Sequence, residues 1–110
     1  MKKLTVSGSS DDLIETSGIK GCDEFNSYKS PYAGQLTVKS KSTGQSIAIH
    51  CIYSGHWCFA VGPLTGDYDA MPNWPITREW GTEEAYSETL TISCPDDAVL
   101  SFDRTEERDD

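Results

Sequence analysis

Apolar residues alternate with polar ones over short stretches of this chain, and segments rich in Gly, Pro, Ser and Asp separate the stretches. A period of two is typical of β-strands with one buried face, because successive side chains of a strand point to opposite sides. We expect strands at residues 4–6, 13–15, 35–39, 46–53, 57–61, 87–93 and 98–102. This pattern predicts an all-β fold with at most a short helix, a small antiparallel barrel or sandwich of six to eight short strands.

The clearest predicted element is a hairpin in the middle of the chain. Residues 46–53 form a long stretch rich in β-branched side chains, Ser54-Gly55 supplies turn residues, and residues 57–61 return. With Ser54-Gly55 as a two-residue turn, Cys51 would lie opposite Cys58, close to the distance of a disulfide. A reducing compartment keeps such thiols reduced, and they then pack as small apolar side chains. We therefore expect free cysteines.

The pattern is lost after this hairpin. Glycines and prolines interrupt residues 63–86, and the sequence predicts an irregular segment there, with no more than one helical turn within residues 77–85. Trp74 and Trp80 lie in this acidic segment. They either fold back to close the end of a small barrel or serve as apolar anchors of a protein interface.

We interpret residues 1–104 as one β domain and residues 105–110 as a flexible acidic tail. No apolar run approaches the roughly 20 residues that cross a bilayer. The polar N-terminus lacks the apolar stretch of about 7 to 15 residues that a signal peptide needs. The sequence therefore predicts a cytoplasmic protein without membrane contact, either a monomer or a small homo-oligomer.

Charge is distributed unevenly along the chain. The formal net charge is −9, with five acids and six bases in residues 1–61 but thirteen acids and three bases in residues 62–110. Direct nucleic-acid binding is disfavoured, because it depends on cations that neutralise phosphates. A protein with a basic nucleic-acid-binding groove is a better partner for an acidic surface, since opposite potentials attract at long range. The other interpretation is that this charge only keeps a small protein in solution.

Candidate catalytic and metal-binding residues do not form a complete constellation. The four cysteines lack the close Cys-x₂₋₄-Cys spacing of structural zinc sites, and His50 and Cys51, as neighbours in a strand, point to opposite faces. The chain has no Gly-x-Ser-x-Gly nucleophile elbow, no phosphate loop and no dinucleotide fingerprint. We therefore expect no metal, no cofactor and no enzymatic activity.

Three segments carry a resemblance to a known group of proteins. The first is residues 5–15, which end in Ser10-Asp11-Asp12-Leu13-Ile14-Glu15 and are followed by Gly21 and Asp23-Glu24-Phe25. The second is Tyr53 with Gly55-x-Trp57. The third is Tyr86-Ser87-Glu88-Thr89-Leu90-Thr91-Ile92. The chain resembles small proteins of bacteria, phages and prophages with a Ser-Asp-Asp-Leu-Ile-Glu start and a Tyr-Ser-Asp-x-Leu-x-Ile end. Glu88 stands where the group usually has Asp, and residues 63–80 do not align with it.

The resemblance implies a context and transfers no individual functional residue. Small acidic proteins of mobile elements are often inhibitors of host defence, anti-CRISPR proteins among them, and many imitate DNA with rows of carboxylates. We therefore expect a protein-binding inhibitor of a defence complex whose acidic surface occupies a nucleic-acid-binding site. The alternative is an immunity or antitoxin-like protein that neutralises a basic toxin such as a nuclease. The predicted partner-binding residues are Asp67, Asp69, Glu79, Glu83, Glu84 and Glu88, with Trp74 and Trp80 as anchors.

Overall fold

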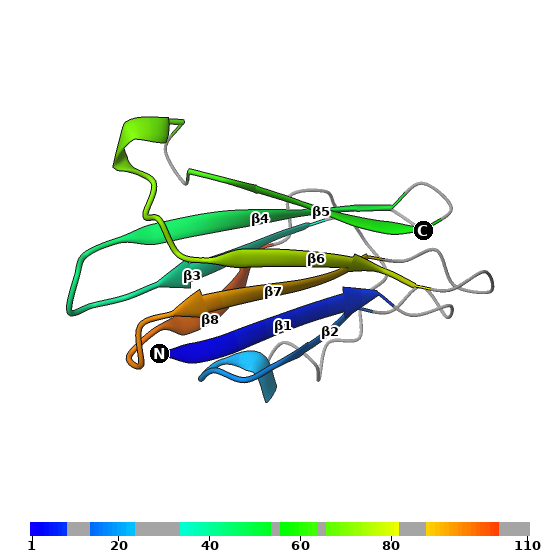
Figure 1. Cartoon of the computed structure of the whole chain (residues 1–110), viewed down its shortest axis with the longest axis horizontal. Helices are drawn as coiled ribbons and strands as arrows, with labels where there is room; N and C mark the ends of the chain where they lie inside the picture. The colour runs from blue at the N-terminus through cyan, green and yellow to red at the C-terminus, as the bar shows by residue number, and fades with distance from the viewer. Residues whose placement is uncertain (9–13, 24–33, 54–55, 64–65, 82–87, 104–110) are drawn as a thin grey trace.

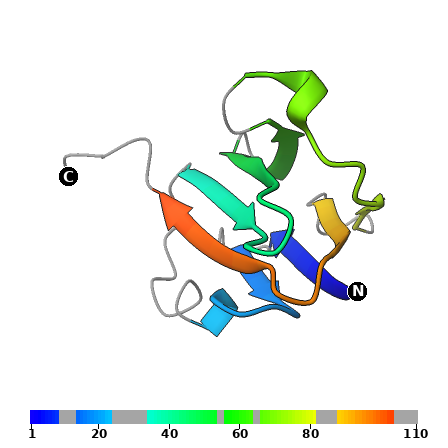
Figure 2. The same cartoon turned by 90° about the vertical axis from the view of Figure 1, so that its left-hand side faces the viewer.

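In a computed structural model of the chain, which describes residues 1–8, 14–23, 34–53, 56–63, 66–81 and 88–103, eight strands form two four-stranded antiparallel sheets. Sheet A has the order β2 (Ile14–Ser17), β1 (Lys2–Gly8), β7 (Glu88–Cys94) and β6 (Ile76–Trp80). Sheet B has the order β5 (Trp57–Gly62), β4 (Ser46–Tyr53), β3 (Gly34–Lys39) and β8 (Val99–Asp103). The sheets lie as two layers, and the short 3₁₀ turn η1 (Tyr68–Ala70) stands outside them (Figures 1 and 2). The predicted all-β sandwich is confirmed.

The core lies between the two sheets and consists largely of every second residue of their strands, the edge strand β5 included. Its fully buried members include Leu4, Val6, Leu90 and Ile92 from sheet A, and Leu36, Val38, Ile47, Ile49, Trp57 and Phe59 from sheet B. Their polar neighbours in the same strands face outward, as the two-residue period predicted. No helix in the described part of the chain is long and apolar enough to cross a membrane. The proposed tail, residues 105–110, lies outside the described residues.

The middle hairpin is present, but its predicted register is wrong by one residue. Tyr53 pairs with Trp57 and Cys51 with Phe59, so three residues, not two, connect β4 to β5. Cys51 therefore faces the core, whereas Cys58 lies on the outer face opposite Ile52. Both are free thiols, and burial raises the pKa of Cys51 to about 12. Ser54-Gly55, the predicted turn, lies outside the described residues.

Strand β6 was not predicted from the sequence. Residues 76–80 pair along β7, from Ile76 opposite Ile92 to Trp80 opposite Glu88. Only Ile76 is a partly buried apolar residue, and the other four side chains are exposed, so β6 shows no alternation of apolar and polar residues. Its strand conformation depends on the hydrogen bonds that β7 provides. The helical turn considered for residues 77–85 is absent from residues 77–81, and the rest lies outside the described residues.

The sandwich is closed along the β2–β8 side by the backbone itself. The N–H of Leu100 donates to the carbonyl of Lys20 at 2.8 Å, and Lys20 forms a parallel bridge with Val99. Gly21 follows with a φ of +99°, and a Cβ at this position would lie 2.1 Å from the carbonyl oxygen of Leu100. Only glycine combines this left-handed conformation with so close an approach of two chain segments.

A carboxylate joins two turns at one end of the sandwich. Asp97, in the turn between β7 and β8, accepts hydrogen bonds from the Ser40 hydroxyl and the Ser42 N–H, each at 2.7 Å. Both donors belong to the turn between β3 and β4. These hydrogen bonds, with that of Ser40 first, lower the pKa of Asp97 below its ordinary value of 3.8.

Gly8 continues the inward row of β1 and leaves space for Trp57. A Cβ on Gly8 would lie 2.5 Å from Trp57 Cβ and Cδ1, and Trp57 is fully buried. We expect Gly8→Ala to lower the free energy of unfolding by about 1–3 kcal/mol in urea denaturation. Gly62→Ala is the matched control, because no atom lies within 4 Å of its added Cβ, and it should change stability by less than about 0.5 kcal/mol. Equal losses in both variants would contradict this packing argument.

Asp97 makes stability depend on pH. Its pKa is lower in the folded than in the unfolded protein, so its contribution is complete above the ordinary value of 3.8 and is lost as pH falls through the folded pKa. We expect Asp97→Asn to flatten this acid-side loss when unfolding is measured across the pH range. Asp96→Asn is the control, because the Asp96 carboxylate forms an exposed ion pair with the N-terminal amine. An unchanged pH profile in Asp97→Asn would refute this assignment.

Candidate protein-interaction surface

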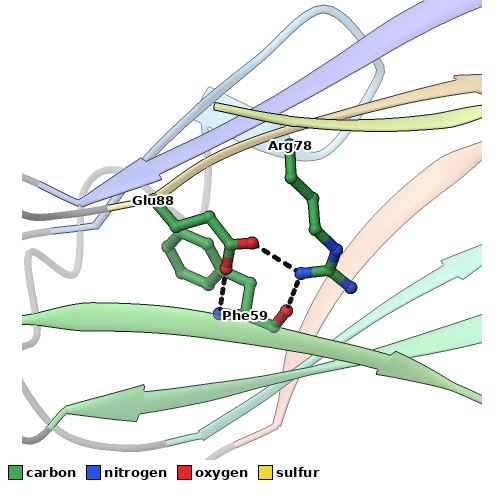
Figure 3. Close-up of polar contacts among 3 residues, drawn as sticks. All are labelled: Phe59, Arg78 and Glu88. Carbon is green, nitrogen blue, oxygen red and sulfur yellow. Dashed lines mark hydrogen bonds and ion pairs between the residues drawn. The ribbon is translucent and has the colours of Figure 1, made fainter. Parts of the chain in front are cut away.

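Glu88, predicted to contact a partner, is instead buried between the two sheets. Only 3% of its surface is exposed. One carboxylate oxygen accepts a hydrogen bond from the N–H of Phe59 at 2.7 Å, and the other accepts one from Nη1 of Arg78 at 2.7 Å (Figure 3). Arg78 Nη1 also donates to the carbonyl of Phe59. Glu88 is therefore not exposed for contact with a partner in this structure, because its carboxylate is hydrogen-bonded to Phe59 and Arg78.

This arrangement occupies the middle of the edge strand β5. Both backbone groups of Phe59 bond to side chains from sheet A, so both point away from β4 and toward the open edge of sheet B. Without these side chains, the N–H and the carbonyl of Phe59 would have no hydrogen-bond partner or would be free to pair with another strand. Arg78 and Glu88, from β6 and β7, satisfy both groups and join the two sheets on this side.

Trp74 is also unavailable to a partner. It is 8% exposed and belongs to the hydrophobic core, with Met71 and Ile76 packed against the same core. In this structure Trp74 is therefore not an exposed anchor, and it packs onto the domain as the alternative interpretation expected. A buried indole next to two prolines fixes the path of the connection between η1 and β6.

The remaining predicted residues that the structure describes are exposed, and they form two separate groups. Asp67 and Asp69 flank Tyr68 on η1, where the Asp67 side chain accepts the N–H of Asp69 at 3.1 Å. Tyr68 is 74% exposed. In Figure 1, η1 stands near the beginning of β4, whereas β6 runs away from it and ends toward the opposite end of the molecule. The structure therefore does not bring Asp67 and Asp69 together with Glu79 and Trp80.

The second group lies where β6 ends. Trp80 is 58% exposed, and its ring meets the ring of His56 edge to face, with centroids 5.9 Å apart and an interplanar angle of 67°. Glu79 is exposed beside it. We call Glu79, Trp80 and His56 the Trp80 group. Glu83 and Glu84 follow in the sequence but lie outside the described residues.

Neither Tyr68 nor His56 was among the predicted partner-binding residues. Tyr68 had a sequence signal, because it stands between two acids in a segment interrupted by glycines and prolines. His56 had none, since its contact with Trp80 joins residues 24 positions apart on the edges of different sheets.

On the outer face of sheet A, the two middle strands carry hydroxyl groups and one charged residue, Lys3, near the start of β1. Across the four strands, one row consists of Ser17, Thr5, Thr91 and Thr77, and the next consists of Glu15, Ser7, Thr89 and Glu79. Hydroxyl groups therefore fill the middle of this face, and its two carboxylates lie on the edge strands β2 and β6. The exposed acids are at the edges and turns, which is where a charged partner would contact the protein.

The described residues contain no group of three or more His, Cys, Asp or Glu side chains that could hold a metal ion. Comparisons with protein-family models, with curated proteins and with solved structures gave no match. The candidate surface is thus defined by exposure, charge and ring geometry alone.

The contribution of Glu88 can be measured by removing its charge. Glu88→Gln keeps the size of the side chain but loses the ion pair and at least one of its two hydrogen-bonding roles, so we expect a loss of about 1–3 kcal/mol in the free energy of unfolding. Glu79→Gln removes the same charge from an exposed position of β6 and should change stability by less than about 0.5 kcal/mol. A double-mutant cycle with Arg78→Gln should show coupling. If the losses of stability in Glu88→Gln and Arg78→Gln simply add in the double variant, the two side chains do not act together at the Phe59 backbone.

Proposed function

We propose that this protein is a protein-binding inhibitor of a host defence complex, of the anti-CRISPR kind, whose acidic surface occupies a nucleic-acid-binding site. The observation that carries the proposal is the Trp80 group, in which a large exposed aromatic ring and the exposed carboxylate of the preceding residue project from opposite faces of the end of β6. Tryptophan is enriched among residues that dominate the energy of protein interfaces.

The charge of the chain favours a basic partner. Residues 62–110 carry thirteen acids and three bases, and one of those bases, Arg78, is neutralised by Glu88. A groove that binds nucleic acid presents Lys and Arg to phosphates, and the same cations attract exposed carboxylates. Occupation of that groove would block nucleic acid by direct competition. The context of defence inhibition comes from the resemblance of the chain to small phage and prophage proteins.

Charge reversal next to Trp80 should weaken the inhibitor and leave the fold intact. We expect Glu79→Lys and the double variant Glu83→Lys/Glu84→Lys each to weaken binding to the target by about tenfold or more, since a close charge pair couples by at least about 1.4 kcal/mol. The measurement is recovery of the target from lysate of a defence-competent bacterium, with elution by a salt gradient. Mass spectrometry then identifies the target.

Glu15→Lys is the matched control for Glu79→Lys, because it makes the same charge change on the opposite edge strand, β2, and it should bind nearly as the parent protein does. The proposal requires a nucleic-acid-binding complex that is released by moderate salt and displaced by added DNA. Recovery of one dedicated toxin would support the antitoxin-like alternative instead. Equal weakening by Glu15→Lys would mean that net charge, and not this surface, causes the binding.

A further inference from the structure

Trp80 is exposed, and its ring packs edge to face with the ring of His56. Of the three tryptophans, Trp57 and Trp74 are buried, and Trp80 alone presents most of its surface to solvent. Its edge-to-face contact with His56 links the end of β6 to the beginning of β5, which are edge strands of different sheets. An aromatic ring that is oriented before binding loses little conformational entropy when a partner contacts it.

The described charges around this ring favour a cation as its ligand. Arg78 lies two residues before Trp80 on the same side of β6, but its guanidinium is bound to Glu88 and to the Phe59 carbonyl. Its positive charge is therefore compensated, whereas the exposed carboxylate of Glu79 is not paired with any described cation. Glu79 points to the other side of the strand, so it acts on a charged ligand of the ring through its electrostatic field and not by direct contact.

We propose that Trp80 receives an arginine side chain of the partner, with the guanidinium stacked on the indole face. This inference rests on the proposed function for the basic character of the partner and adds the chemical group that is recognised. Cations are attracted to the face of an aromatic ring, most strongly to that of tryptophan. The guanidinium of arginine is planar and weakly hydrated, so it stacks on an indole at a lower desolvation cost than the compact ammonium of lysine.

The test compares a blocked alternating Gly–Arg peptide with a Gly–Lys peptide of equal length and charge. Both are titrated against the full chain at low ionic strength, with binding followed by the fluorescence anisotropy of a dye on the peptide. The long-range attraction is the same for both peptides, so the ratio of their affinities isolates stacking. We expect the Arg peptide to bind the parent protein more tightly, and Trp80→Ala to reduce this preference by roughly two- to five-fold.

Three further variants make the outcome specific. Trp80→Phe should keep part of the preference, and His56→Ala should lower it by freeing the ring. Tyr68→Ala removes an exposed aromatic that also has acidic neighbours and should leave the preference unchanged. Equal affinity for the two peptides, no binding of the Arg peptide, or an unchanged preference in Trp80→Ala would overturn the inference. Capture of a DNA-competed complex that is insensitive to Trp80→Ala would reject the arginine site while leaving the proposed function standing.

Discussion

The contact of Arg78 and Glu88 with the backbone of Phe59 is the constraint on which this side of the structure depends. It supplies hydrogen-bond partners to the backbone N–H and carbonyl in the middle of an edge strand. It also compensates the charge of a buried carboxylate and joins sheet A to sheet B. Removal of either side chain would leave a buried polar group without a partner, and such groups cost more than their hydrogen bonds contribute. Pairing with β7 places β6 in sheet A, and this contact ties β6, which ends in Trp80, to the edge of sheet B.

The two open sides of the sandwich are closed by different means. The β2–β8 side uses a backbone hydrogen bond at Leu100, whose close approach requires a glycine at position 21. The β5–β6 side uses side chains, because β6 and β5 belong to different sheets and contact each other through Arg78. At these two positions, Phe59 and Leu100, the edge backbone groups are already hydrogen-bonded and are not free to pair with an added strand.

The same contact also decides how charge is presented. Burial of Glu88 removes one of the expected surface acids, and its pairing removes the charge of Arg78. What remains exposed on β6 is the Trp80 group, separated along the molecule from the acids of η1 (Figure 1). An acidic segment that is continuous in sequence thus becomes two distinct surfaces, and only the one at Trp80 combines an oriented ring with an uncompensated carboxylate among the described residues.

The sequence by itself determined the fold class, because burial of one strand face acts on every second residue and is visible within a single strand, as in residues 35–39 and 46–53. It also determined the sign of the surface charge. Only the tertiary structure decided which polar and aromatic residues reach that surface. Glu88 is buried because Arg78 and Phe59 satisfy it, Trp74 is buried because the core accommodates its ring, and β6 is a strand because β7 pairs with it. Each of these outcomes depends on a partner that another part of the chain supplies, and no local pattern records such a partner.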